Sequence, residues 1–176
     1  MNGRPLRADA LRNHRRIVDA ATVAFADEGA AASLEEIARQ AGVGSATLHR
    51  RFPTRASLFE AVYADQVEQL LAPQPASDDP VEALDEWLRR FVGFIIGKRA
   101  FGEEMAHDTE LVHDARRRIY AAVEPLLAAA QRSGGARDDV SADDVLRMLS
   151  GIGLADYPQP GQLDRVIGVC LRGLHP

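Results

Sequence analysis

Residues 42–59 read GVGSATLHRRFPTRASLF and contain three arginines and one histidine, with no acidic residue among them. Glycine adopts the left-handed backbone conformation that ends a helix at almost no steric cost, and proline cannot continue a helix. Leu48 and Phe52 lie four residues apart, which places both on one face of a helix. The stretch therefore predicts a turn at Gly42, a short helix that buries Leu48 and Phe52, and a new helix after Pro53.

The residues before this stretch predict another short helix. The segment SLEEIARQ, residues 33–40, has Ser33 at its start and Glu36 three residues later, which is the pattern of a capping box. Two short helices joined by a tight, glycine-containing turn form a helix-turn-helix, here over about residues 33–52. In this motif the second helix enters the major groove of DNA, where small polar residues at its start reach base edges and arginines at its end reach phosphates. A helical hairpin with a solvated basic face is the alternative.

Residues 17–62, IVDAATVAFADEGAAASLEEIARQAGVGSATLHRRFPTRASLFEAV, resemble the TetR family of bacterial transcriptional regulators. The resemblance joins the Ala-Gly-Val turn, the Phe-Pro break and a following basic-x-x-Leu at fixed offsets. The family usually has tyrosine where His49 stands and lysine where Arg55 stands, and both usually contact phosphate. Histidine and arginine can make the same contacts, and a histidine there makes DNA affinity sensitive to pH.

The motif and the resemblance together predict which residues meet double-stranded operator DNA. We expect Thr47 to contact base edges, His49 and Arg55 to contact phosphate, and Ser33 to donate to a phosphate as well as cap its helix. Either Arg50 or Arg51 is expected to reach a further phosphate. The full expected DNA-binding set is Ser33, Gly44, Ser45, Ala46, Thr47, His49, Arg50, Arg51 and Arg55.

The composition indicates a globular protein of ordinary size. The chain has 176 residues and a single cysteine, Cys170, which excludes an intramolecular disulfide framework and zinc-finger spacing. No secretory signal or membrane-spanning apolar run is recognisable, so we expect a cytoplasmic protein without membrane contact. Residues 1–60 carry nine arginines against seven acidic residues, whereas the remainder carries twelve basic and nineteen acidic residues. This asymmetry favours an N-terminal part that approaches a polyanion and a C-terminal part that repels one.

Helical spacing of apolar residues continues through the rest of the chain and predicts an all-α fold. A loop at 73–80 precedes four expected helices, at roughly 81–98, 108–132, 141–155 and 161–174, and Pro125 is expected to kink the second of them. We therefore expect a three-helix DNA-binding domain in residues 1–58 and a helical effector-binding and dimerisation domain in residues 59–176.

The expected helix over residues 81–98 is apolar on nearly every side and should be central to the second domain. In the TetR family this region binds ligands of variable chemistry, so the resemblance implies a cavity for a small, largely apolar effector. Plain core packing is the alternative for each residue considered alone. The candidate ligand-binding residues are Trp87, Phe91, Phe94, Met105, His107, His113, Tyr120 and Met148.

Metal and enzyme readings find little support in the sequence. Glu103 and His107 lie one helical turn apart, as two metal ligands would, but the acids around them lack the spacing of a metal site, so no metal is expected. Ser45 and His49 are also one turn apart, yet no orienting carboxylate accompanies them. The resemblance implies no catalysis either, and we expect neither an enzyme nor a cofactor.

The last two expected helices carry apolar stripes. Such stripes can pack on their own domain, but the resemblance implies that both helices pair with their copies in a four-helix homodimer interface. The expected interface residues are Val145, Leu149, Ile152, Leu163, Val166, Ile167, Cys170, Leu171 and Leu174. The sequence and the resemblance thus predict a ligand-responsive DNA-binding transcriptional regulator, a repressor that a small molecule releases from its operator. A regulator without a small-molecule effector, controlled by another protein or constitutive, is the alternative.

Overall fold

The computed structural model describes residues 4–73, 77–99 and 109–176, and within these ranges the secondary structure is entirely helical. The predicted all-α fold is confirmed. The chain divides into two compact units. Among the described residues, the first unit comprises residues 4–66 and 109–111, and the second comprises residues 67–73, 77–99 and 112–176. The predicted boundary between residues 58 and 59 stays a prediction, and it falls inside one continuous helix.

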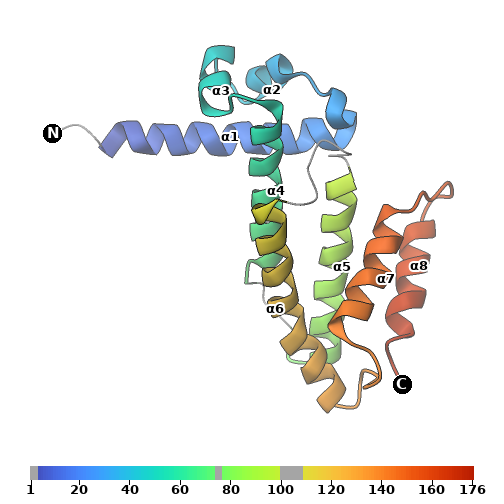
Figure 1. Cartoon of the computed structure of the whole chain (residues 1–176). Helices are drawn as coiled ribbons and strands as arrows, with labels where there is room; N and C mark the ends of the chain where they lie inside the picture. Colours follow the sequence, from blue (N-terminus) through green and yellow to red (C-terminus); the bar gives the residue numbers. More distant parts are fainter. Residues whose placement is uncertain (1–3, 74–76, 100–108) are drawn as a thin grey trace. The chain divides into compact units, whose positions relative to one another are not determined.

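The first unit is a helix-turn-helix packed on a long helix. Its elements are α1 (Arg4–Glu28), the short 3₁₀ helix η1 (Gly29–Ala31), α2 (Leu34–Gln40), α3 (Ser45–Arg51) and most of α4 (Arg55–Leu71). Figure 1 shows α2 and α3 on the same side of α1. The rings of Phe25 on α1 and Phe59 on α4 stack with centroids 4.1 Å apart, and both side chains are fully buried. Leu48 and Phe52, at α3 and its end, are buried as well.

The turn between α2 and α3 has the predicted geometry. Gly42 has a φ of 62°, in the left-handed region that favours glycine. Its amide donates to the carbonyl of Arg39, and the amide of Val43 donates to the carbonyl of Ala38, both at 3.0 Å. These two bonds form a Schellman motif, which ends α2 within one residue and turns the chain into α3.

The helix starts on either side of α3 are capped by side chains, with one departure from prediction. The Ser33 hydroxyl accepts from the amide of Glu36 at 3.4 Å, so the predicted cap is confirmed. The second bond of a capping box, from the amide of Ser33 to the carboxylate of Glu36, was a wrong prediction. That carboxylate instead accepts from Arg39 and Gln40, one turn further along the helix. Thr54 caps α4 by accepting from the amide of Ser57 at 3.1 Å.

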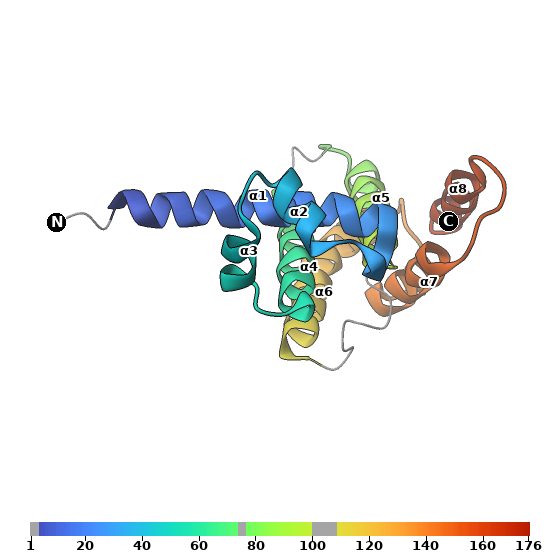
Figure 2. The same ribbon diagram turned by 90° about the horizontal axis from the view of Figure 1, so that it is seen from above.

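The second unit contains the last turn of α4 and four further helices. These are α5 (Pro80–Arg99), α6 (Glu110–Arg132), α7 (Ala142–Leu154) and α8 (Gln162–Arg172). α7 packs against α5, and α8 runs antiparallel beside α7 (Figures 1 and 2). A Cβ at Gly153 would lie 2.7 Å from Cγ2 of Ile95, so the glycine lets α7 approach α5 closely. Leu84 and Leu88 of α5 are buried in the centre of this unit.

The ends of these helices follow from short-range signals. The carboxylate of Asp79 accepts from the amide of Val81 at 2.8 Å, and Pro80 is the first helical residue of α5. α7 begins with a complete capping box between Ser141 and Asp144. Pro125 lies inside α6, which continues to Arg132, and the kink predicted there stays a prediction.

Candidate nucleic-acid interface

One face of α3 is packed and the opposite face is open to solvent. Leu48 and Phe52 are buried, as their spacing predicts. The first residues of the helix and its basic end lie on the other side. Ser45, Ala46, His49, Arg50 and Arg51 are exposed, and Thr47 is half-buried. Small polar groups at the start and cations at the end of one open helix face form a surface suited to a DNA groove flanked by phosphates.

The fold requires glycine at one of the two positions before α3 and not at the other. Gly42 is required internally, because its φ is 62° and a Cβ there would lie 2.2 Å from Nη2 of Arg16. Gly44, at the start of α3, has an ordinary φ of −70°, and a Cβ there would meet no atom within 4 Å. Packing within the unit therefore gives no reason for glycine at position 44. Close approach of an outside surface to this backbone does give one.

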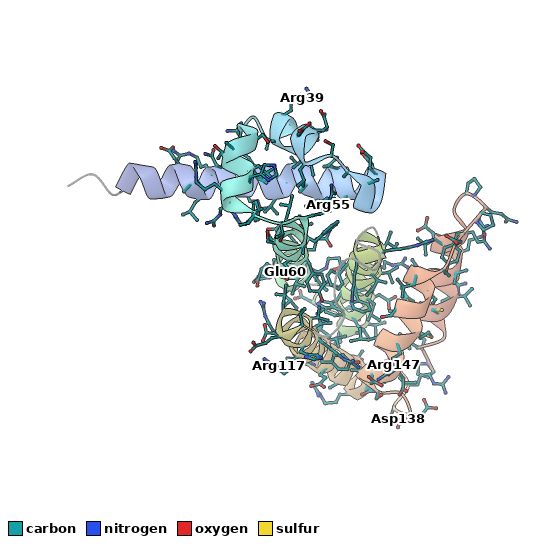
Figure 3. All side chains as sticks on the ribbon, turned by 45° about the horizontal axis from the view of Figure 1, so that its top comes forward. Arg39, Arg55, Glu60, Arg117, Asp138 and Arg147 are labelled. Carbon is teal, nitrogen blue, oxygen red and sulfur yellow. The ribbon has the colours of Figure 1, made fainter. Side chains whose placement is uncertain are left out.

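The cations around α3 are held to different degrees. Arg50 has no hydrogen-bond or ion-pair partner in the described part of the chain. Arg51 donates from Nε to Nδ1 of His14 at 3.2 Å. Arg55 donates from Nη1 to the carbonyl of Ala32 at 2.7 Å and so ties the start of α4 to the segment before α2 (Figure 3). Arg50 is thus available to an anion as it stands, whereas Arg51 and Arg55 also hold neighbouring segments together.

His14 is a site residue that the sequence reasoning missed. It lies on α1, half-buried, with its ring centroid 5.3 Å from that of Phe52. Burial lowers the pKa of His14 below 6.5, and the positive charges of Arg51 and Arg15 lower it further, against an opposing effect of Asp65. The imidazole is therefore neutral at pH 7 and its Nδ1 can accept a hydrogen bond. No local signal links positions 14 and 51, which are 37 residues apart.

A groove between α1 and α3 extends this surface beyond the helix-turn-helix. His14, Asn13 and Asp9 line it from α1, and Thr47 and Arg50 line it from α3. The part of α1 that precedes the segment with the family resemblance therefore borders α3 across this groove. The basic run RNHRR, residues 12–16, is the feature of the sequence that points to this part of α1.

The candidate ligand-binding residues lie in three separate places of the second unit. Trp87, Phe91 and Phe94 are buried on α5, and the first two rings stack with centroids 5.8 Å apart. His113 and Tyr120 lie on the outer face of α6, where the hydroxyl of Tyr120 donates to Asp143 at 2.5 Å.

Met148 belongs to a third place, an apolar groove between α7 and α8 that Cys170 also lines. The predicted residues Met105 and His107 lie outside the described residues. Within the described residues, the three aromatic residues of α5 are thus the largest group of the predicted set that lies together.

The candidate dimer residues divide by burial. Val145, Leu149, Ile167, Leu171 and Leu174 are buried within their own protomer and offer a partner little surface.

Ile152, Leu163, Val166 and Cys170 are half-buried. The apolar side chains that α7 and α8 turn most strongly to solvent are others: Leu154 is 54% exposed and Val169 is 61% exposed. Gly151, on the same side of α7 as Leu154, is also exposed, and a Cβ there would meet nothing within 4 Å. The open apolar surface of this helix pair is therefore shifted from the stripe that the sequence suggested.

Two models of known protein families match most of the chain. A family model described as bacterial regulatory proteins, tetR family, matches residues 17–62. A second, described as transcriptional regulator SbtR-like, C-terminal domain, matches residues 79–176. The chain therefore belongs to the TetR family of bacterial transcriptional regulators.

Two solved structures of the family resemble the chain over most of its length. The TetR transcriptional regulator SCO0520 from Streptomyces coelicolor is 38% identical, with a TM-score of 0.78 over 93% of this chain and 98% of that one. A TetR transcription regulatory protein from Mycobacterium vanbaalenii is 32% identical, with a TM-score of 0.72 over 98% of this chain and 100% of that one.

A curated relative is similar over a shorter stretch. The HTH-type transcriptional repressor LfrR from Mycolicibacterium smegmatis is 42% identical over 82 residues, which span 46% of this chain and 42% of that repressor. The match therefore covers less than half of the repressor's length. Among the described helices of our chain, none has both the length and the apolar composition needed to cross a bilayer.

Proposed function

We propose that this TetR-family regulator binds double-stranded operator DNA as a homodimer and represses transcription until a small molecule releases it. The observation that carries the DNA-binding part is the open face of α3, whose cations and small polar residues surround a glycine that internal packing does not require. Repression is supported by the similarity to a protein named as a transcriptional repressor.

The contacts of α3 suggest a role for each residue of the interface. Thr47 reads base edges, because it lies at the start of the helix, at the rim of the groove between α1 and α3. His49 and Arg50 contact phosphate from the exposed basic end. Ser33 accepts a bond from Glu36 and keeps its hydroxyl proton for donation to a phosphate. Arg55 contacts phosphate while its Nη1 holds Ala32.

The remaining residues of the interface act through their small size. Gly44, Ser45 and Ala46 form the first turn of α3, and their short side chains let the helix start enter the groove deeply. Substitution of any of them by a large residue would hold the whole helix away from the bases.

Dimerisation places two copies of α3 on successive turns of the same DNA face. We place the interface on the solvent side of α7 and α8, around Met148, Gly151, Leu154, Val166 and Val169. These residues are exposed or half-buried, so pairing with a second copy would remove their apolar surface from water. The glycine permits close approach of the paired helices.

The effector site is proposed beside the stacked rings of Trp87 and Phe91 on α5. A ligand there must bind the DNA-incompetent state more tightly than the competent one, and full switching needs a preference of roughly 5.5 kcal/mol. The apolar lining favours an uncharged or weakly charged, largely apolar molecule. The chain has one tryptophan, so Trp87 fluorescence is a direct reporter of binding at this place.

Two measurements test this function. Duplexes that the purified protein selects from a random library should be retained in a gel-shift assay, and Thr47→Ala should change the preference among them. Arg50→Ala should weaken binding to all sequences alike. Arg39→Ala is the matched control, because Arg39 is bonded to Glu36 on the outer side of α2 (Figure 3).

For the effector, apolar compounds that release the duplex should also change Trp87 emission. Release without a change in emission would move the site away from α5. Failure of every such compound to cause release would favour the regulator without a small-molecule effector, in which the stacked rings of Trp87 and Phe91 are plain core.

A further inference from the structure

The carboxyl end of α3 rests on a residue of α1 that lies outside the matched family segment. The family model begins at residue 17, whereas α1 begins at Arg4 and carries His14. Nδ1 of His14 accepts a hydrogen bond from Nε of Arg51 at 3.2 Å. The same imidazole lies beside the ring of Phe52, the residue that ends α3. One side chain of α1 therefore contacts both the last helical residue of α3 and its cap.

This contact uses one edge of the Arg51 guanidinium and leaves the other edge open. Arginine has five N–H donors, one on Nε and four on the two Nη atoms. His14 takes the Nε donor, and the two Nη groups remain available to bind a phosphate with two parallel bonds. An arginine held in this way does not have to lose its rotamer freedom when DNA binds.

The charges around His14 favour the neutral, accepting form of its ring. Arg51 and Arg50 approach it from α3, and Arg15 lies next to it on α1. Asp65 of α4 opposes them, but its carboxylate is bonded to Arg15 at 2.9 Å. Asp9 lines the far part of the groove and forms an ion pair with Arg12. Protonation of the His14 ring would remove the acceptor at Nδ1 and place a positive charge that repels the guanidinium of Arg51.

We propose that His14 is a positioning residue for DNA binding, which orients Arg51 so that its two Nη groups face a backbone phosphate. This inference rests on the proposed function, adds a phosphate contact of Arg51 to that of Arg50, where the sequence favoured only one of the two, and extends the interface to α1. Its consequence is that an uncharged side chain, which itself touches no DNA, controls part of the salt dependence of operator affinity. A residue that only stabilises the fold would leave the salt dependence unchanged.

The test is a salt titration of operator affinity by fluorescence anisotropy, at a pH of about 8 where His14 is neutral. The full-length protein is compared with Arg51→Ala, His14→Ala, His14→Asn and the double variant His14→Ala with Arg51→Ala. Loss of Arg51 should weaken binding about ten-fold or more, as expected for a charge-assisted contact. It should also flatten the slope of log K against log salt by about 0.9 per phosphate, and so by about 1.8 for a dimer.

His14→Ala should reproduce part of both effects although it removes no charge. We expect roughly three-fold weaker binding and a slope between those of the wild type and Arg51→Ala. The double variant should match Arg51→Ala, because His14 acts through that arginine. His14→Asn should restore the wild-type slope, because its amide oxygen occupies the place of Nδ1. Thermal melting of each variant separates these effects from loss of fold.

Two outcomes would overturn the inference and leave the proposed function standing. One is a folded His14→Ala variant with the wild-type slope. The other is a double variant that binds DNA more weakly than Arg51→Ala by the full effect of the histidine change. Failure of the wild-type protein to retain any selected duplex would overturn the proposed function and this inference together.

Discussion

Gly42→Ala should loosen the helix-turn-helix without touching its DNA-facing residues. The left-handed conformation costs a residue with a Cβ about 1–2 kcal/mol, and the φ of 62° at this position requires that conformation. The new methyl group would also displace the guanidinium of Arg16, whose Nη2 now bonds the carbonyl of Gly42 at 3.3 Å. Arg16 is exposed, so this second cost is small beside the first.

The cost should appear where the turn lies. A loss of 1–2 kcal/mol should speed hydrogen exchange of the amides of α2 and α3 by about 5–30-fold if they exchange by opening of this unit. The melting temperature of a unit of this size should fall by about 4–8 °C for each kcal/mol. Exchange in α5 and α7 should not change, because those helices belong to the other compact unit.

Gly44→Ser is the matched control, two residues away. Serine is a better helix cap than glycine by a few tenths of a kcal/mol, and the added side chain meets nothing in the protein. This variant should melt no lower than the wild type and yet bind operator DNA more weakly, because its side chain enters the space proposed for DNA. Gly42→Ala should melt at a lower temperature than the wild type, but it should bind operator DNA as the wild type does at temperatures where it is folded. Unchanged exchange of α2 and α3 in Gly42→Ala would refute the reasoning.

Three further predictions concern pH and assembly. The pKa of His14 is lowered on folding, so below a pH of about 6.5 the unfolded chain binds a proton that the folded chain does not bind. Stability should therefore fall as the pH drops through about 6.5. In melting curves recorded at a series of pH values, His14→Asn should show a smaller fall. The pKa of Asp143 is lowered first by its bond from Arg147 and then by its bond from Tyr120. The stabilisation that the charged carboxylate gives should therefore be lost only in acid, as the pH falls below the usual pKa range of Asp. In that acid range the melting temperature of Asp143→Asn should depend less on pH than that of the wild type. Val169→Glu should give folded monomers in light scattering, whereas Val23→Glu, at an equally exposed valine on α1, should stay dimeric.

The helix-turn-helix could be predicted from the sequence because its determinants are local. A glycine at position 42, a proline at 53 and a cap at Ser33 each act within about one helical turn. Glu36 shows the limit of such reasoning. Its spacing from Ser33 fits a capping box, but Arg39 and Gln40 lie as near on the other side, and their bonds lower its pKa to about 2. Spacing alone does not decide between competing partners.

The second unit was less predictable at the level of single residues. A stripe such as Val145 and Leu149 shows that a helix buries one face, but not whether its own protomer or a partner covers that face. Gly153 brings α7 against α5, and the protomer itself then buries this stripe. The hydrogen bond between His14 and Arg51 joins positions 37 residues apart, and no local sequence pattern predicts it.

The most direct test of the central claim is selection of DNA by the purified protein from a random library, followed by sequencing of the retained duplexes. If two copies of α3 read successive major grooves, the selected sequences should contain two inverted half-sites whose centres lie about one helical turn, 10–10.5 base pairs, apart or a multiple of this. Thr47→Ala should then select a different half-site with the same spacing. Retention of DNA without a shared symmetric sequence, or no retention at low salt, would contradict the assignment of this chain as an operator-binding regulator.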